Sequence, residues 1–256
     1  MHDFSTEVML PLCKTLLSRS RQEIAVIDTY FKMTLLLRAS LALNTLDYFQ
    51  TVASLTRSLF ELWLDLKILA QDTTGDDVRR YNEFPELERY RAAERLVEFA
   101  ATNPVTMDIS AQQAFCNDPQ RKQQIASIKT QRKAQRKRRN LPEHWTDKDV
   151  RARACSVGQE AMYVEAYPLL SWYVHAGAAG TAGMDRASLE PVFGFCHHLI
   201  QRIFLDATAA CAKVTKISKL DHFDNWMTGI ELTTGKLIQQ EQIKLLREKQ
   251  QQAAMP

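Results

Sequence analysis

The apolar residues of this chain are spaced as they are in α-helices. Large hydrophobic side chains recur every three or four positions over most of the sequence, which places them on one face of a helix. Residues 50–71 are the most hydrophobic segment and carry two such faces, which predicts a helix buried between its neighbours. The two faces comprise Leu55, Leu59, Leu62, Leu66 and Leu69 on one side and Phe60, Leu64 and Ile68 on the other.

Residues 21–49 predict a second long helix, which also has two apolar stripes. Two stripes on one helix indicate contacts on more than one side, so we expect this helix to be central. The first stripe comprises Ile24, Ile27, Phe31, Leu35, Ala42 and Phe49, and the second comprises Val26, Tyr30, Met33 and Leu37.

Proline and capping residues set the bounds of the other predicted helices. Asn117-Asp118-Pro119 begins a helix with proline at its first position, and Thr146-Asp147-Lys148-Asp149 resembles a capping box that opens a helix to residue 167. We expect a bend at Pro85 and an interruption at Pro168. The remaining predicted helices are residues 4–20, 76–101, 169–176, 188–216 and 236–253.

These elements predict an all-α fold: a multi-helix bundle with an interrupted basic helical insertion and a C-terminal helix. We expect one helical domain over residues 1–216, with the basic insertion at 117–145. Residues 217–256 are expected to form an irregular segment and a terminal helix. A thin apolar stripe in 236–253 predicts either a helix that binds a partner protein or a second copy, or a loosely docked terminal helix.

Composition agrees with an α-helical globular protein. Hydrophobic residues make up 45% of the chain, and glycine and proline occur only eight times each, which is few for a sandwich or barrel. The five cysteines are odd in number and contain no C-x-x-C pair, so we expect free thiols and a cytoplasmic protein. Residues 1–4 do not start a signal peptide, and no apolar run reaches the roughly 20 residues that span a bilayer.

Arg57 and Glu61 form the first candidate site. Their spacing of four residues places both side chains on one face of the predicted helix 50–71. Apolar residues surround that face, so the two charges are expected to be withdrawn from water and to satisfy each other. The pair is either a buried ion pair that fixes helix register or part of a functional site.

Two further candidates lie on other helices. Ser171 and His175 are also four residues apart, at the end of a short apolar helix that precedes the glycines at 177, 180 and 183, where a cleft could open. Arg91, with Glu94, adds another arginine and carboxylate, which could equally form a solvated face. A core histidine is the alternative interpretation of His175.

A separate pattern lies at residues 139–144. Arg139-Asn140-Leu141-Pro142-Glu143-His144 matches the R-N-x-x-x-H pattern of HEPN ribonucleases, in which arginine and histidine cleave RNA without a metal. This resemblance implies that His144 moves a proton and that Arg139 stabilises the phosphate charge. Pro142 departs from the helical geometry of that family, and an arginine is expected by chance in so basic a region.

The basic region itself is the most unusual part of the sequence. Residues 121–139 contain nine Lys or Arg and no Asp or Glu, which indicates a site for RNA or another polyanion. Because the region has no aromatic residue, it would contact phosphates and would not read bases. The predicted contacts are Arg132, Lys133, Arg136, Lys137 and Arg138; a solvated helix or loop is the alternative.

Motifs for other chemistries are absent from the sequence. It contains no glycine-rich phosphate loop, no H-E-x-x-H pair and no G-x-S-x-G turn, and His197 and His198 are adjacent and point about 100° apart on a helix. We therefore expect no metal and no cofactor.

The order of these features resembles a known family. An apolar helix carries Arg57-Ser58-Leu59-Phe60-Glu61, a helix with Tyr90-Arg91 follows, and then come Trp145 and Ser171-x-x-x-His175. Over residues 30–180 this is similar to a bacterial all-helical family known only as a domain of unknown function, DUF5677. The resemblance implies a helical fold, and the basic insertion looks specific to this protein.

Three functions remain open from the sequence. The first is a HEPN-like, metal-independent ribonuclease or nucleotide-processing protein of phage defence or a toxin system, with Arg57, Glu61, Arg91, Ser171 and His175 as its site. In a narrower version Arg139 and His144 take the catalytic roles. The second is a non-catalytic helical scaffold for a partner protein or nucleic acid, and the third is a sensor that binds a small anion through Arg57 and Arg91.

Overall fold

The computed structural model describes residues 9, 11, 13, 19–103, 107–135, 144–174 and 185–217, and within these ranges it is all-α. The α-helices are α2 (Arg21–Ala42), α3 (Phe49–Gln71), α4 (Asp76–Thr102), α5 (Ser110–Asn117), α6 (Pro119–Gln135), α7 (Val150–Ser156), α8 (Glu160–Val174) and α10 (Arg186–Val214), with a 3-10 turn, η2 (Leu46–Tyr48), before α3. The predicted all-α fold is confirmed. The predicted helices over 4–20 and 236–253 lie outside or almost outside the described residues.

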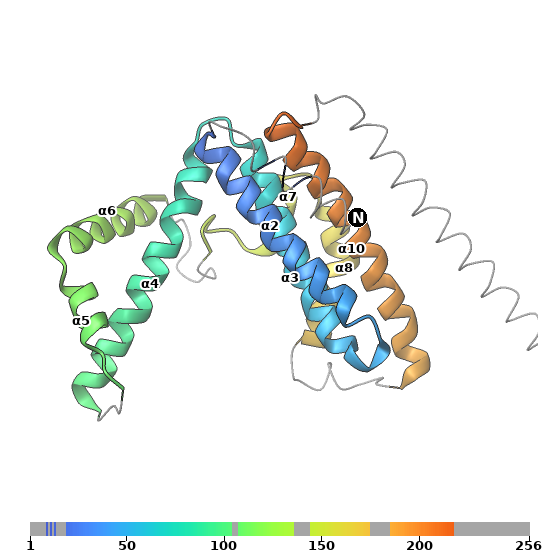
Figure 1. The fold of residues 1–256 in the computed structure, drawn as a ribbon, viewed down its shortest axis with the longest axis horizontal. Coiled ribbons are helices and arrows are strands. Elements are labelled where there is room, and N and C mark those ends of the chain that lie inside the picture. The colour runs from blue at the N-terminus through green and yellow to red at the C-terminus, as the bar shows by residue number, and fades with distance from the viewer. Residues whose placement is uncertain are drawn as a thin grey trace, which may run out of the picture.

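Helix α3 is the centre of the bundle, as its two apolar faces predict. It packs against α2, α8 and α10, and more lightly against α4 and α7. Figure 1 shows α2, α3 and α10 side by side. Phe60, Trp63 and Leu64 are completely or almost completely buried, so both faces of α3 lie in the main core.

Helix α4 leaves the bundle and carries a second, smaller core. Its first turns lie beside α2 and α3, and its later turns form an arm with α5 and α6 (Figure 1). Leu87 and Tyr90 of α4 meet Ile125 and Ile128 of α6 in this second core, and Phe115 packs against it. The two isoleucines are the only large apolar residues that the sequence provides in residues 121–139, and both are buried.

Helix α2 buries one of its two predicted stripes and exposes most of the other. Val26, Tyr30 and Met33 have no exposed surface, whereas Ile24, Phe31 and Leu35 are 43%, 45% and 50% exposed. The expectation of a helix covered on both stripes is therefore wrong. The bundle lies on one side of α2. The predicted helix over 21–49 ends at Ala42, and η2 lies between α2 and α3.

Three other local expectations need correction. Residues 146–167 do not form one helix, because Gly158 adopts a left-handed φ of 71° between α7 and α8. Asp149, and not Thr146, caps α7 by accepting a hydrogen bond from the Ala152 backbone N–H at 2.7 Å. Pro168 lies inside α8 without interrupting it.

Two of the chemical expectations can be compared with the fold. All five cysteines are unpaired, and only Cys155 is exposed. Within the described ranges, none of the helices combines the length and apolar character that crossing a bilayer requires.

Candidate functional site

Arg57, Glu61 and Tyr167 form the exposed edge of a polar cluster between α3 and α8. The Arg57 Nε lies 3.2 Å from Glu61 Oε1 and donates to the Tyr167 hydroxyl at 3.1 Å. The tyrosine hydroxyl in turn donates to Glu61 Oε1 at 2.9 Å, and the guanidinium lies 5.1 Å from the centre of its ring. The predicted ion pair is therefore present. With Arg57 22% and Glu61 32% exposed, it is only partly withdrawn from water.

Arg153 of α7 closes the buried end of this cluster. Its side chain is only 3% exposed, and Nη1 donates to Asp65 Oδ1 at 2.7 Å while Nη2 donates to Glu61 Oε2 at 3.2 Å. Glu61 and Asp65 are one turn apart on α3, so one guanidinium can bind both carboxylates. The four-residue spacing of Arg57, Glu61 and Asp65 was visible in the sequence. Nothing in the sequence marked Arg153 as their partner.

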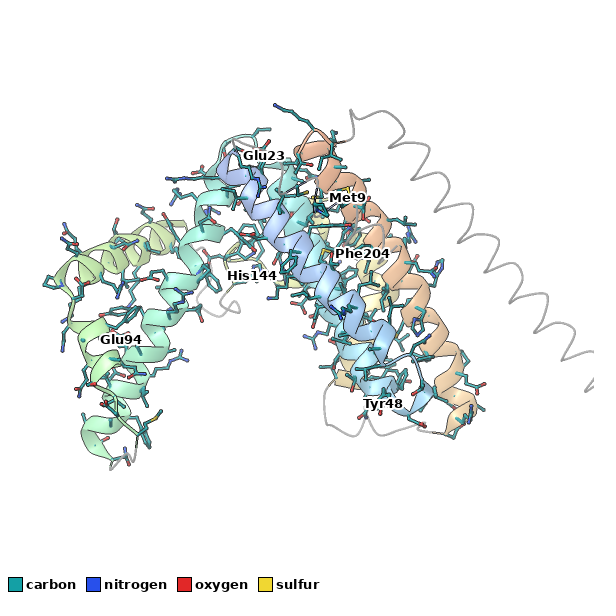
Figure 2. The ribbon with its side chains drawn as sticks, viewed as in Figure 1. Met9, Glu23, Tyr48, Glu94, His144 and Phe204 are labelled. Atoms are coloured by element: carbon teal, nitrogen blue, oxygen red, sulfur yellow. The ribbon has the colours of Figure 1, made fainter. Side chains whose placement is uncertain are left out.

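His144 joins the cluster from the segment before α7. Its Nε2 lies 3.4 Å from Asp65 Oδ2, and its Nδ1 accepts a hydrogen bond from the Thr146 backbone N–H at 3.2 Å. The Thr146 hydroxyl also contacts Nδ1, at 2.9 Å. Both ring nitrogens are thus engaged by groups of the protein. Figure 2 shows His144 between the main bundle and the arm.

The electrostatics of the cluster favour the ionised form of Asp65. Burial raises the pKa of Asp65, but the hydrogen bond with His144 and the charge of Arg153 lower it more, and the result lies below the usual 3.8. Burial and the neighbouring Glu61 carboxylate raise the pKa of Tyr167, so its hydroxyl keeps the proton that it donates to Glu61. Two carboxylates and two guanidinium groups therefore balance one another between the helices.

Two buried donors border the cluster without a hydrogen bond of good geometry to a described residue, Arg153 Nε and the indole Nε1 of Trp145. The indole nevertheless interacts with the Asp65 carboxylate and helps to lower the pKa of Asp65. The Trp145 ring packs edge-on against Tyr81 at 5.5 Å, and the whole residue is buried. A water or ligand oxygen could satisfy either group; the other donors described above already have acceptors.

The predicted convergence of five residues occurs only in part. Arg57 and Glu61 meet, and Ser171 lies one turn beyond Tyr167 on α8, partly buried. Arg91 lies elsewhere: it pairs with Glu88 at 2.7 Å on α4, next to the second core. Figure 2 places Glu94, one turn further along α4, well out on the arm. His175 and Arg139 lie outside the described residues.

The described part of the basic region is tied to neighbouring acids. Arg121 lies 2.9 Å from Glu86 of α4, and Lys129 lies 3.5 Å from Glu94. These pairs hold α6 against α4. The charge of the basic region is therefore partly used within the arm.

Arg132 is committed to contacts within the protein. Its Nη2 donates to the His144 carbonyl at 2.6 Å and to Asp147 Oδ1 at 2.7 Å, and its guanidinium lies 5.1 Å from the centre of the Phe84 ring. The prediction that Arg132 contacts phosphate is not favoured by this geometry. The side chains of Lys133, Arg136, Lys137 and Arg138 lie outside the described part of the structure.

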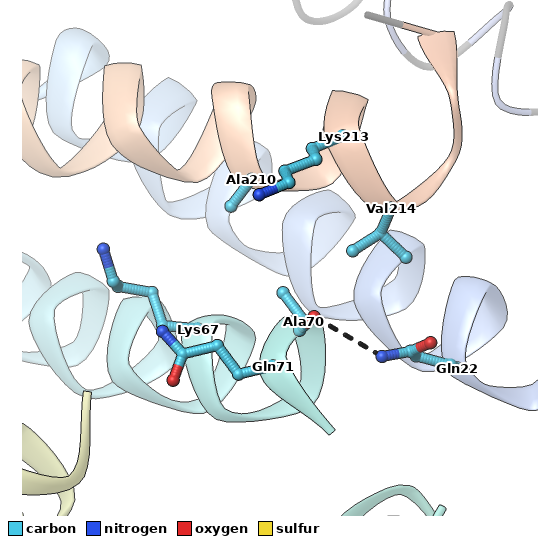
Figure 3. A pocket seen from close by; sticks show the side chains of 7 residues that line it. All are labelled: Gln22, Lys67, Ala70, Gln71, Ala210, Lys213 and Val214. Carbon is cyan, nitrogen blue, oxygen red and sulfur yellow. Dashed lines mark hydrogen bonds between the residues drawn. The ribbon is translucent and has the colours of Figure 1, made fainter. Parts of the chain in front are cut away.

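A hollow of about 340 Å³ lies elsewhere, between the ends of α2, α3 and α10 (Figure 3). Gln22 spans it by donating to the Leu69 and Asp72 carbonyls at 2.8 and 2.9 Å. Lys67, which also lines the hollow, forms an ion pair with Asp206 at 2.9 Å. Among the residues that the structure describes, no group of three His, Cys, Asp or Glu side chains could hold a metal ion.

Residues 23–186 match a family of unknown function, DUF5677. The chain belongs to this family. The match extends somewhat beyond residues 30–180, where the sequence resemblance was found, and it includes every residue of the polar cluster. No curated protein and no solved structure matched the chain.

For this DUF5677 member, the match places the polar cluster and the basic region inside the family segment and leaves most of α10 outside it. The HEPN-like pattern at 139–144 also falls within the segment. The family description gives no activity to either feature, so the chemistry rests on the residues themselves.

Proposed function

We propose that this protein is a non-catalytic helical module that binds RNA through the basic segment 133–143. The observation that carries the proposal is the contact of Arg132 with the His144 carbonyl, 2.6 Å long. It joins the residue before the segment to the residue after it. Arg132 and His144, which flank the segment, are therefore held together where α6 meets the polar cluster.

The composition of the segment supports phosphate binding. Between residues 133 and 143 there are five Lys or Arg, a single acid (Glu143) and no aromatic residue. A cluster of cations binds a phosphate backbone without reading its sequence, and such binding weakens steeply with salt. The cations at 121, 129 and 132 have acidic partners, so most of the charge that remains for RNA lies in the segment.

The polar cluster supports a structural role for His144 in this proposal. A general acid or base needs one ring nitrogen that faces the substrate. In His144, Asp65 and Thr146 engage both nitrogens, and Arg153 anchors Asp65 from the other side. The metal-independent ribonuclease stays an untested prediction, because Arg139 and His175 lie outside the described residues.

Fluorescence anisotropy with a labelled single-stranded RNA tests the proposal. The variant replaces Arg136, Lys137 and Arg138 by glutamine, and the control replaces Arg89, Arg186 and Lys213, three exposed cations elsewhere, and has the same net charge. We expect the first variant to reduce the slope of log K against log salt by about 2, since each phosphate contact contributes roughly 0.7 for single strands. The control should bind like the wild type.

The same RNA, incubated in excess chelator and run on a gel, separates the proposal from the ribonuclease. We expect intact RNA. If the wild type cleaves the RNA and His144→Ala or His175→Ala does not, the protein is an enzyme and the proposal of a non-catalytic module is wrong. Equal binding by both triple variants would show that the basic segment does not contact RNA.

A further inference from the structure

The exposed face of α2 has the residue spacing of a coiled-coil seam. Seven positions on this helix, 21, 24, 28, 31, 35, 38 and 42, are exposed and are separated by alternating steps of three and four residues. These steps keep all seven within about one third of the helix circumference. The apolar residues Ile24, Phe31, Leu35 and Ala42 therefore lie on one face of the helix, opposite the buried stripe, with Asp28 and Arg38 between them.

Two of the three charges in this seam are arranged symmetrically. Asp28 and Arg38 are exposed seam residues, placed on either side of Phe31 and Leu35, whereas Arg21 lies at the N-terminal end of the seam. Neither forms an ion pair with another residue in the described ranges of the chain. In most coiled coils, a charge at such a position is unfavourable unless the opposite helix supplies its counter-ion.

The sequence of the seam is complementary to itself when it runs in the opposite direction. Two α2 helices can pack antiparallel in a register in which the numbers of any two facing residues add up to 66. In this register Ile24 faces Ala42. In the same register, Phe31 faces Leu35. Asp28 then faces Arg38, and the two-fold axis produces each contact twice.

We propose that α2 is the interface of an antiparallel homodimer, in which two copies of this chain pair their α2 seams in this register. The interface would contain six layers. The two central layers pair Phe31 with Leu35, an Asp28–Arg38 ion pair follows on each side of them, and an Ile24–Ala42 layer lies at each end. Isologous pairing requires a patch that complements itself, and the alternation of the seam meets that requirement without a residue from another element. Leu41, which is 50% exposed beside the seam, adds apolar area to its end.

The proposed interface contains no residue of the polar cluster. The cluster residues lie on α3, α7 and α8 and at His144, and the buried stripe of α2 lies between α3 and the seam. The inference is independent of RNA binding, because the seam contains none of the residues assigned to that function.

Charge reversal tests both the interface and its register. Sedimentation equilibrium of the full chain should give a dimer, with twice the chain mass of 29.3 kDa. Asp28→Arg places two arginines opposite each other, and Arg38→Asp places two aspartates there, so each single variant should raise the dissociation constant roughly 100-fold. The double variant Asp28→Arg/Arg38→Asp restores opposite charges and should recover the dimer to within about tenfold of the wild type.

Lys122→Glu, on the exposed side of α6, is the control reversal and should leave the dimer unchanged. Circular dichroism checks that every variant is folded. A monomeric wild type at about 50 μM would overturn the proposal and leave the seam to another occupant, such as residues 236–253. A dimer that survives both single reversals would overturn the interface, and a double variant that stays monomeric would overturn the register.

Discussion

Arg153 donates a 2.7 Å hydrogen bond to Asp65, which lies 88 residues earlier in the chain, and both side chains are at least 90% buried. This contact joins α7 to the central helix α3. Glu61 and His144 attach to the same pair from either side, so the contact links the bundle to the segment that precedes α7. The cluster therefore fixes the position of His144, the residue that follows the basic segment, relative to the bundle.

Removing Arg153 is expected to destabilise the protein strongly. Arg153→Met leaves Asp65 buried without its counter-ion, which typically costs about 3–5 kcal/mol in the free energy of unfolding. Urea denaturation followed by circular dichroism measures the loss. The control is Arg151→Met, two residues away, where an exposed arginine pairs with an exposed Glu160 and no measurable loss is expected. Equal losses in the two variants would contradict a buried, structural Arg153.

Asp65 is expected to make stability sensitive to acid. Because its pKa is lower in the folded protein than the 3.8 of an unfolded chain, its ionised form stabilises the fold above that value. This contribution is lost as the pH falls through the lower, folded pKa. The difference in unfolding free energy between the wild type and Asp65→Asn should therefore be large at pH 6 and should shrink below pH 3.8. A difference that stays constant between pH 6 and pH 3 would contradict this assignment.

The second core is expected to stabilise the arm alone. Ile128→Ala removes one of the buried isoleucines that hold α6 on α4, at a local cost of about 2–5 kcal/mol. Hydrogen exchange measured by mass spectrometry should become faster in α5 and α6 and stay unchanged in α10. The matched variant Ile200→Ala, in the main core, should instead lower the stability of the whole bundle. Faster exchange throughout the chain in Ile128→Ala would show that the two cores unfold together.

Local sequence patterns were sufficient to predict the all-α fold and its most buried helix. Helix α3 could be predicted because two apolar faces on one helix require neighbours on both sides. The start of α6 at Pro119 could be predicted because the capping side chain and the proline act within one turn. The Arg57–Glu61 pair could be predicted for the same reason, since four residues of one helix define its geometry.

Only the packing of the helices decided which residues join the polar cluster. Both stripes of α2 contain large apolar residues, and the charges of Asp28 and Arg38 in one of them are the sequence signal that marks it as the exposed stripe. Arg153 and His144 contact Asp65 from segments that are distant in the sequence. Arg91 has a local sequence pattern similar to that of Arg57, but it lies on the arm and pairs with Glu88 there. Local periodicity fixes the face of a helix on which a side chain lies, but only the packing of distant helices fixes what that face meets.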